Sequence, residues 1–217
     1  MLDYQQQEKW EFIPSAWQSP IDIETKQVEQ KNINQTPLVF LTDYVFESVI
    51  SKGNNLQFNG RGRMKLKGNE FEFQQLHFHI PAEHILDGKV YPMEWHFVHQ
   101  NNIGQPLVVA LFVELGQDNS ILQPFYEKDN LRDGEKQAFE YRLPMNKLIT
   151  ENKQNAYNYL GSLTTPPLSR GVEWWVLQQP LVVSIMQLKA LQESFNGNAR
   201  ETQRKSGRKI ILYRSEF

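Results

Sequence analysis

Short apolar or alternating runs, separated by turn residues, dominate most of the chain. Alternation of apolar and polar residues with a period of two is typical of half-buried β-strands. The segments with this character are 19–25, 38–51, 55–80 and 90–100. The run 106–115 is apolar almost throughout, which favours a strand that is covered on both faces. The pattern therefore predicts a mainly β protein.

Turn and helix signals subdivide this pattern. Breaks between strands are expected at Asn59-Gly60, Lys67-Gly68-Asn69 and Asp87-Gly88. Helical spacing is weak in 121–129 and stronger in 184–197, where Ser184 and Gln187 are spaced as in a capping box. We find no repeat, low-complexity tract or linker, so residues 1–217 are interpreted as a single domain with one or two surface helices.

Composition narrows the class of function. The 23 basic and 25 acidic residues leave a formal charge of −2, so a nucleic-acid or anionic-membrane partner is not expected. The absence of cysteine excludes disulfides and thiolate metal ligands. Residues 1–12 have neither region of a signal peptide, and no apolar run reaches the roughly 18 residues of a membrane-spanning helix. We therefore expect a cytoplasmic protein.

All five histidines lie between positions 77 and 99. A strand places residues i and i+2 on one face, so His77 and His79 are expected to point the same way. If the chain returns beside this strand after the turn at Asp87-Gly88, His96 can meet both of them. Three convergent imidazoles form the protein part of a catalytic zinc site that keeps its fourth position open.

Two further residues strengthen the metal interpretation. Gln75 and Glu94 each lie two positions from a candidate ligand, on the same face, where they can accept the second N–H of an imidazole.

The spacing His77-x-His79-x3-Glu83 also fits the metal motif of cupins, which bind iron or manganese and would use Glu83 as a ligand. The cupin pattern expects a later histidine, and none follows position 99.

Three segments together resemble the α-class carbonic anhydrases. They are "QSPIDI" (18–23), "LHFHIPAEH" followed by "GKVYPMEWHFVH" (76–99), and "YLGSLTTPPLSRGVEWWVL" (159–177). The resemblance extends from about residue 17 to residue 213. It implies a single domain around a large twisted, mostly antiparallel central sheet with a few surface helices. It also implies a zinc enzyme that reversibly hydrates CO2 to bicarbonate and a proton through zinc-bound hydroxide.

The resemblance also implies roles for individual residues. Zinc would be held by His77, His79 and His96, with Gln75 and Glu94 as hydrogen-bond partners of the ligand histidines. Glu83 would then accept a hydrogen bond from the hydroxyl of Thr164, which thereby orients the zinc-bound hydroxide. Sulfonamides and small anions are the expected inhibitors, because they would take the open zinc position.

The remaining matches concern the substrate pocket and the other histidines. The residues that match the wall of the CO2 pocket are Val98, Val108, Leu163, Thr165, Val172 and Trp174. His84 and His99 match histidines of the family that do not bind zinc, and we expect both to have structural hydrogen-bonding roles.

The chain departs from the family at the position of the proton shuttle. Many members carry a histidine after the glycine of a segment that matches "SKGNNLQF" (51–58), whereas Asn54 follows Gly53 here. Asparagine cannot carry a proton near neutral pH, and Lys52 would stay mostly protonated. We therefore expect proton transfer to limit turnover and small buffers to accelerate it.

Two questions stay open at this stage. The N-terminal segment is shortened, and Tyr4 has no clear match to the tyrosine that the family places near its active-site water, so Tyr4 is given no role. Some relatives with this fold are non-catalytic binding modules that have lost zinc ligands. All three ligands are present here together with Glu83 and Thr164, which favours the enzyme. A homodimer remains an open alternative to a monomer.

Overall fold

The computed structural model describes residues 2–10, 16–34, 37–128, 130–150 and 155–215. The strands are β1 (Asp22–Ile23), β2 (Glu29–Ile33), β3 (Leu38–Phe40), β4 (Tyr44–Ser51), β5 (Leu56–Arg61), β6 (Arg63–Leu66), β7 (Asn69–His79), β8 (Ile85–Leu86), β9 (Lys89–Val90), β10 (Met93–Gln100), β11 (Pro106–Leu115), β12 (Lys136–Leu143), β13 (Ala156–Ser162), β14 (Arg170–Val183) and β15 (Ile211–Ser215). The helices are α1 (Gln123–Tyr126), α2 (Met145–Thr150) and α3 (Ile185–Phe195), with short 3-10 turns η1 (Gln7–Lys9) and η2 (Thr25–Gln27).

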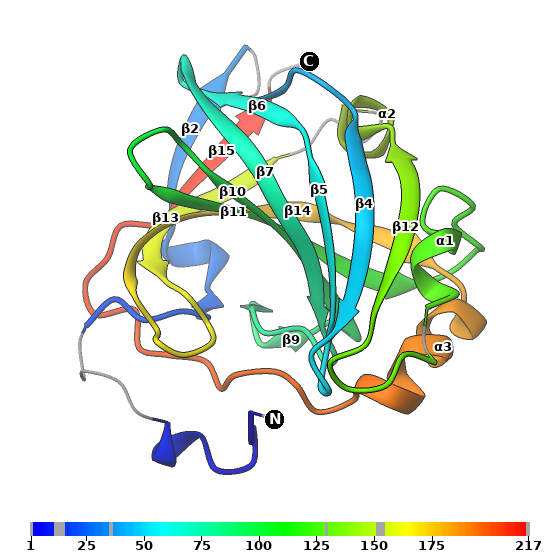
Figure 1. Ribbon diagram of the computed structural model, residues 1–217. Helices are drawn as coiled ribbons and strands as arrows, with labels where there is room; N and C mark the ends of the chain where they lie inside the picture. The colour runs from blue at the N-terminus through cyan, green and yellow to red at the C-terminus, as the bar shows by residue number, and fades with distance from the viewer. Residues whose placement is uncertain (1, 11–15, 35–36, 129, 151–154, 216–217) are drawn as a thin grey trace.

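A twisted twelve-stranded sheet forms the body of the molecule (Figure 1). Its main path runs β12-β4-β5-β7-β10-β11-β14-β13-β15-β2, and β3 and β6 pair at one side of β7. Most neighbours are antiparallel, whereas β11 pairs with β14 and β15 pairs with β2 in parallel. The predicted fold class, a large and mostly antiparallel central sheet, is confirmed.

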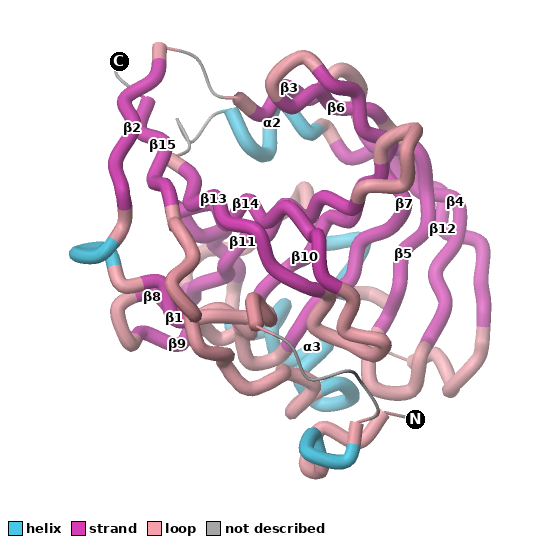
Figure 2. The backbone as a smooth tube through the Cα atoms, turned by 90° about the vertical axis from the view of Figure 1, so that its left-hand side faces the viewer, coloured by secondary structure: helices cyan, strands magenta, loops and turns pink. Residues whose placement is uncertain are grey.

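Apolar side chains pack on both faces of the sheet. We call the larger group, which includes Phe58, Trp95 and Leu111, the large core. The group on the other face, which includes Ala110 and Trp174, is called the small core. Strand β11 contributes alternate residues to each, so the expected strand covered on both faces is confirmed. Figure 2 shows β10, β11, β14 and β13 side by side at the centre of this arrangement.

Two of the three expected turns are confirmed. Lys67 and Gly68 have φ angles of 50° and 88°, and Asp87 and Gly88 have φ angles of 49° and 77°. Two successive residues with positive φ are typical of the tight hairpin turns that match the twist of antiparallel strands. Each pair joins two neighbouring strands, β6 to β7 and β8 to β9.

The predicted break at Asn59-Gly60 is wrong, because β5 continues through both residues. Glycine is required at position 60 for a different reason. A Cβ atom there would lie 2.3 Å from the carbonyl oxygen of Val45 on the neighbouring strand β4. The glycine therefore permits close approach of two strands rather than a turn.

The stronger helix prediction is confirmed and the weaker one only in part. Ser184 caps α3, since its hydroxyl accepts from the backbone N–H of Gln187 and the Gln187 side chain accepts from the Ser184 N–H. The expected helix at 121–129 is the single turn α1, and α2 is a helix that the sequence pattern did not indicate. None of the helices in the described ranges is long and apolar enough to cross a membrane.

Candidate metal centre

Strands β7 and β10 pair in an antiparallel register that sets His96 opposite His77 and Glu94 opposite His79. All three candidate ligands therefore project from the same face of two adjacent strands. One nitrogen of each imidazole lies within 4.8 Å of the corresponding nitrogens of the other two. The structure thus brings the predicted ligand set together at one point.

The predicted hydrogen-bond partners of two ligands are also in place. Nδ1 of His77 lies 2.9 Å from Oε1 of Gln75, and Nε2 of His96 lies 2.9 Å from Oε1 of Glu94. An acceptor on one ring nitrogen fixes the proton there and leaves the other nitrogen with a lone pair. Nε2 of His77 and Nδ1 of His96 are the nitrogens that remain.

His79 finds an acceptor that the sequence did not indicate. Its Nδ1 lies 2.7 Å from the backbone carbonyl oxygen of Asn198, a residue 119 positions away. Its Nε2 is fully buried and has no hydrogen-bond partner in the described part of the chain. A buried polar nitrogen without a partner is costly unless a ligand completes it, so this orphaned atom fits a metal ion.

The electrostatics at His77 and His79 favour neutral imidazoles. Burial, reinforced by the neighbouring imidazoles, holds the pKa of His77 well below its usual range. Burial also lowers the pKa of His79, although Glu83 opposes this shift. Metal binding requires unprotonated imidazole nitrogen, and three such ligands with an open fourth position match catalytic zinc.

Glu94 is a buried carboxylate with every lone pair directed at a donor. Its Oε2 accepts from the backbone N–H groups of Glu83 and His84, and its Oε1 accepts from the rings of His84 and His96. Burial alone would raise the pKa of Glu94, but the charges and hydrogen bonds of both histidines outweigh burial and hold it well below its usual range. His84 also contacts the hydroxyl of Tyr159 at 2.6 Å, so both of its nitrogens are occupied.

Glu83 and Thr164 are only partly connected to this arrangement. Oε1 of Glu83 accepts from the backbone N–H of Arg200 at 2.9 Å and lies 3.3 Å from Nδ1 of His79. Oε2 of Glu83 is buried without a hydrogen bond to any described residue. Thr164 is buried in the loop between β13 and β14. The hydrogen bond from Thr164 to Glu83 therefore stays a prediction.

The residues expected to form an apolar wall gather in one place. Val108, Val172 and Trp174 belong to the small core, and Val98 and Leu163 pack against it half-buried. The ring of Trp174 lies 5.0 Å from that of His96, so this wall adjoins the candidate metal ligands. Thr165 is half-buried in the same loop as Leu163.

Asn54, at the shuttle position, is held by the N-terminal segment. Its Nδ2 donates to the carbonyl oxygen of Leu2 at 3.1 Å, and its backbone carbonyl oxygen accepts from the side chain of Asn198. Tyr4 lies in the same segment, and burial together with the negative charge of Glu83 raises its pKa. Tyr4 is thus close enough to Glu83 to be affected by its charge. The sequence alone left the place of Tyr4 relative to the site undecided.

His99 lies on the opposite face of β10 from the metal candidates. Its Nε2 contacts the hydroxyl of Tyr44 at 2.6 Å, and its ring packs against Phe73 in the large core. Burial lowers the pKa of His99 to about 3. The expected structural role of this histidine agrees with these contacts.

Stability should therefore fall in acid partly because of His99. The unfolded chain protonates this residue near pH 6.5, whereas the folded protein does so only near pH 3. Between these values the unfolded state binds more protons, so His99 destabilises the fold by about 2 kcal/mol at pH 5. His99→Gln lacks this loss. The difference in free energy of unfolding between the two proteins, measured by denaturant titration, should therefore shrink by about 2 kcal/mol from pH 7 to pH 5. A constant gap would contradict the assignment.

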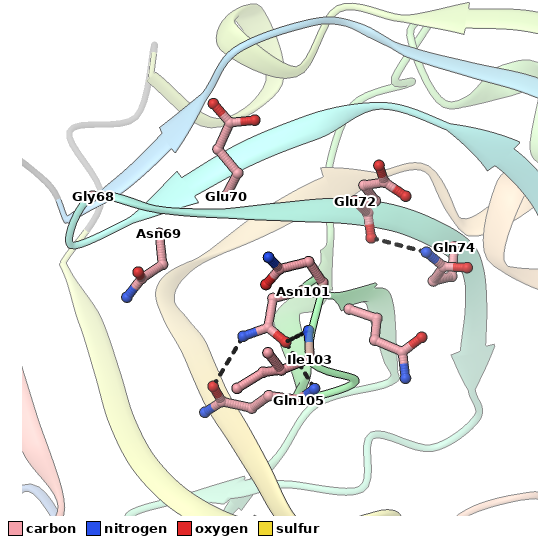
Figure 3. Close-up of a pocket in the computed structure, with 10 residues that line it drawn as sticks. Gly68, Asn69, Glu70, Glu72, Gln74, Asn101, Ile103 and Gln105 are labelled. Carbon is pink, nitrogen blue, oxygen red and sulfur yellow. Dashed lines mark hydrogen bonds between the residues drawn. The ribbon is translucent and has the colours of Figure 1, made fainter.

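A polar pocket of about 850 Å³ lies further along the same strands. Figure 3 shows the turn of Asn101, Ile103 and Gln105 facing the Gly68–Gln74 stretch. Its side chains include six amides, which are Asn69, Gln74, Gln100, Asn101, Asn102 and Gln105. Gln74 directly precedes the His77 partner Gln75 along β7.

Comparisons with known proteins agree with this geometry. The family model described as eukaryotic-type carbonic anhydrase matches residues 5–213. A carbonic anhydrase from Pectobacterium carotovorum is 35% identical over 89% of this chain and 79% of its own length. The α-carbonic anhydrase from Thermovibrio ammonificans, solved in complex with the inhibitor sulfanilamide, is 33% identical and superposes with a TM-score of 0.80 over 90% of this chain and 86% of that one.

A third relative is the α-carbonic anhydrase of Photobacterium profundum, with 33% identity and a TM-score of 0.78 over 90% of this chain and 88% of that one. The match to the family thus covers the sequence motifs and most of the chain that carries them. With its three histidines, their acceptors and the apolar wall on that sheet, the chain belongs to the α-carbonic anhydrase family.

Proposed function

We propose that the protein is a zinc-dependent carbonic anhydrase that interconverts CO2 with bicarbonate and a proton. The observation that carries this proposal is the set of three lone pairs left on His77, His79 and His96 once their other nitrogens are engaged. Family membership supports the reaction, and the donor set supports the metal.

Zinc bound by these histidines supplies Lewis acidity and lowers the pKa of a bound water to about 7, which provides a nucleophile at neutral pH. Glu94 and Gln75 hold two of the imidazoles in the required tautomer and orientation. The negative charge of Glu94 also makes His96 a stronger donor to the metal.

Thr164 and Glu83 are proposed to orient the reacting water. The unpaired Oε2 of Glu83 is a buried acceptor, and the Thr164 hydroxyl is the group proposed to donate to it. A hydroxyl whose proton is engaged in this way can only accept from the water, so it directs the water's lone pair toward the substrate. The backbone N–H of Thr164 is then available to a substrate oxygen.

The apolar wall is proposed to hold CO2. The substrate is small and apolar, so it gains from a surface that excludes water beside the metal. Val98 and Leu163 are half-buried at this surface, whereas Val108, Val172 and Trp174 are buried in the same cluster. Because a relative binds sulfanilamide, we also propose that sulfonamides inhibit this protein by binding at the same place.

Stopped-flow CO2 hydration across buffer concentrations, before and after removal of zinc, tests the function. We expect activity that disappears with a chelator and returns with stoichiometric zinc. We also expect the rate to rise with imidazole buffer, because Asn54 cannot carry a proton. A zinc-loaded protein without activity would instead identify a non-catalytic binding module.

Asn54→His is expected to raise the rate several-fold in weak buffer and to have little effect in strong buffer. The reason is that a histidine titrates near neutral pH and can relay protons. The Asn54 side chain donates to the Leu2 carbonyl, and a histidine could keep that contact through one nitrogen. Equal rates for the two proteins at all buffer concentrations would refute the shuttle argument.

A further inference from the structure

Residues Leu2–Trp10, which we call the strap, fold back on themselves beside the candidate metal centre. The indole N–H of Trp10 donates to the carbonyl oxygen of Asp3 at 2.8 Å, and the Trp10 ring meets Tyr4 edge-on at 5.2 Å. The amide of Gln7 donates to the Tyr4 carbonyl oxygen at 3.0 Å. These local contacts give the strap a defined shape. In Figure 1 the strap lies at the bottom of the view, below the C-terminal stretch of chain that follows α3.

Gln7 joins the strap to that C-terminal part by two hydrogen bonds. Its Nε2 donates to the carbonyl oxygen of Ala199 at 3.2 Å, and its Oε1 accepts from the N–H of Glu201 at 3.0 Å. In an extended segment these two groups point to one side, while the N–H of the intervening residue points to the other. The intervening residue is Arg200, and its N–H donates to Glu83 at 2.9 Å. Gln7 and Glu83 thus hold the same short segment from opposite sides.

The same segment holds one of the candidate zinc ligands. The carbonyl oxygen of Asn198 accepts from Nδ1 of His79 at 2.7 Å. The side chain of Asn198 fixes this segment against β7, because its Oδ1 accepts from the N–H of Ile80 and its Nδ2 donates to the carbonyl oxygen of Phe78. Movement of residues 198–201 would therefore disturb His79 and Glu83 together.

A second connection runs from the strap to the same asparagine. Leu2 accepts from the side chain of Asn54, whose carbonyl oxygen accepts from Nδ2 of Asn198 at 2.9 Å. Two hydrogen-bonded routes therefore lead from the strap to residues 198–201, one through Gln7 and one through Asn54. Only the first depends on a side chain of the strap itself.

We infer that Gln7 is a positioning residue for the metal centre, acting through residues 198–201 on His79 and Glu83. This inference rests on the proposed zinc site. The amide side chain suits the role because its oxygen accepts from the N–H of Glu201 while its NH2 group donates to the carbonyl oxygens of Ala199 and Tyr4. Without it, the carbonyl oxygen of Ala199 and the N–H of Glu201 lose their shared partner, and the acceptor that fixes the His79 tautomer becomes less well placed.

Gln7→Ala tests the inference, with Gln5→Ala as its matched control. Gln5 lies in the same run of three glutamines, but its side chain is exposed and makes no hydrogen bond to the described residues. We expect zinc to dissociate about tenfold more readily from Gln7→Ala, at the lower end of the effect of outer partners of metal ligands. Gln5→Ala should bind zinc as the unmodified protein does. Zinc affinity is measured by chelator competition, well below each protein's unfolding midpoint.

Gln7→Glu provides a nearly isosteric second variant. It keeps an acceptor for the N–H of Glu201 but sets a carboxylate oxygen against the carbonyl oxygens of Ala199 and Tyr4, so its zinc affinity should fall at least as far as that of Gln7→Ala. Unchanged affinity in Gln7→Ala, or equal losses in Gln7→Ala and Gln5→Ala, would overturn the positioning role. If the unmodified protein binds no zinc, the proposed function fails instead, so the two failures are distinguishable.

Discussion

His79→Ala is expected to abolish stoichiometric zinc binding and to lower CO2 hydration by at least about 10³-fold, because the pKa of water returns from about 7 toward 15.7 without the ion. His79 is the ligand whose remaining nitrogen is buried and has no partner among the described residues, so its removal leaves a two-histidine site around a cavity. Metal content by elemental analysis and stopped-flow hydration measure the two effects.

His99→Gln is the control for this experiment. It removes a fully buried histidine from the same pair of strands, but on the face that packs into the large core. Zinc content and hydration should therefore persist in a folded His99→Gln protein. Full activity in His79→Ala would show that the three imidazoles do not form the working site.

Glu83→Gln is expected to lower kcat by about 10²-fold while zinc stays bound, a loss typical of a positioned group in proton-transfer chemistry. The carboxylate accepts from Arg200 through one oxygen, and a glutamine can preserve that contact. The other oxygen would become an N–H2 group, which cannot accept from Thr164. The hydroxyl of Thr164 would then no longer be constrained as an acceptor for the reacting water.

Thr164 variants separate this explanation from general damage. Thr164→Ser keeps the hydroxyl and should retain most of the activity, whereas Thr164→Ala should fall about as far as Glu83→Gln. Groups that act as a unit have strongly non-additive effects. The kcat of the double variant should therefore be about equal to that of the less active single variant. Additive losses would mean that Glu83 and Thr164 act separately and that their proposed hydrogen bond does not form.

The convergence of the three histidines could be predicted from the sequence because strand alternation is local. A spacing of two residues fixes the faces of His77 and His79, and His96 meets them once the chain returns beside β7, as β10 does after the short strands β8 and β9. Gln75 and Glu94 were predictable for the same reason, since each lies two residues from the ring that it contacts.

Contacts that depend on distant segments were not predictable in this way. The acceptor for His79 is a backbone carbonyl of Asn198, and every residue type carries such a group, so the sequence gives no sign of it. Gln7 is one of three consecutive glutamines, and only the path of residues 199–201 distinguishes it from its neighbours. Gly60 was mistaken for a turn because its requirement comes from Val45 on another strand.

The amide-lined pocket along β7 bears on how selective inhibitors could be made. A compound anchored at the histidines would have to reach along β7 past Gln75 to Gln74 to enter this pocket. There it would meet polar side chains such as Gln105, whose Oε1 accepts from the Asn101 amide. Hydroxyl-bearing extensions, such as a sugar, match those groups, whereas an aryl extension would desolvate them without compensation.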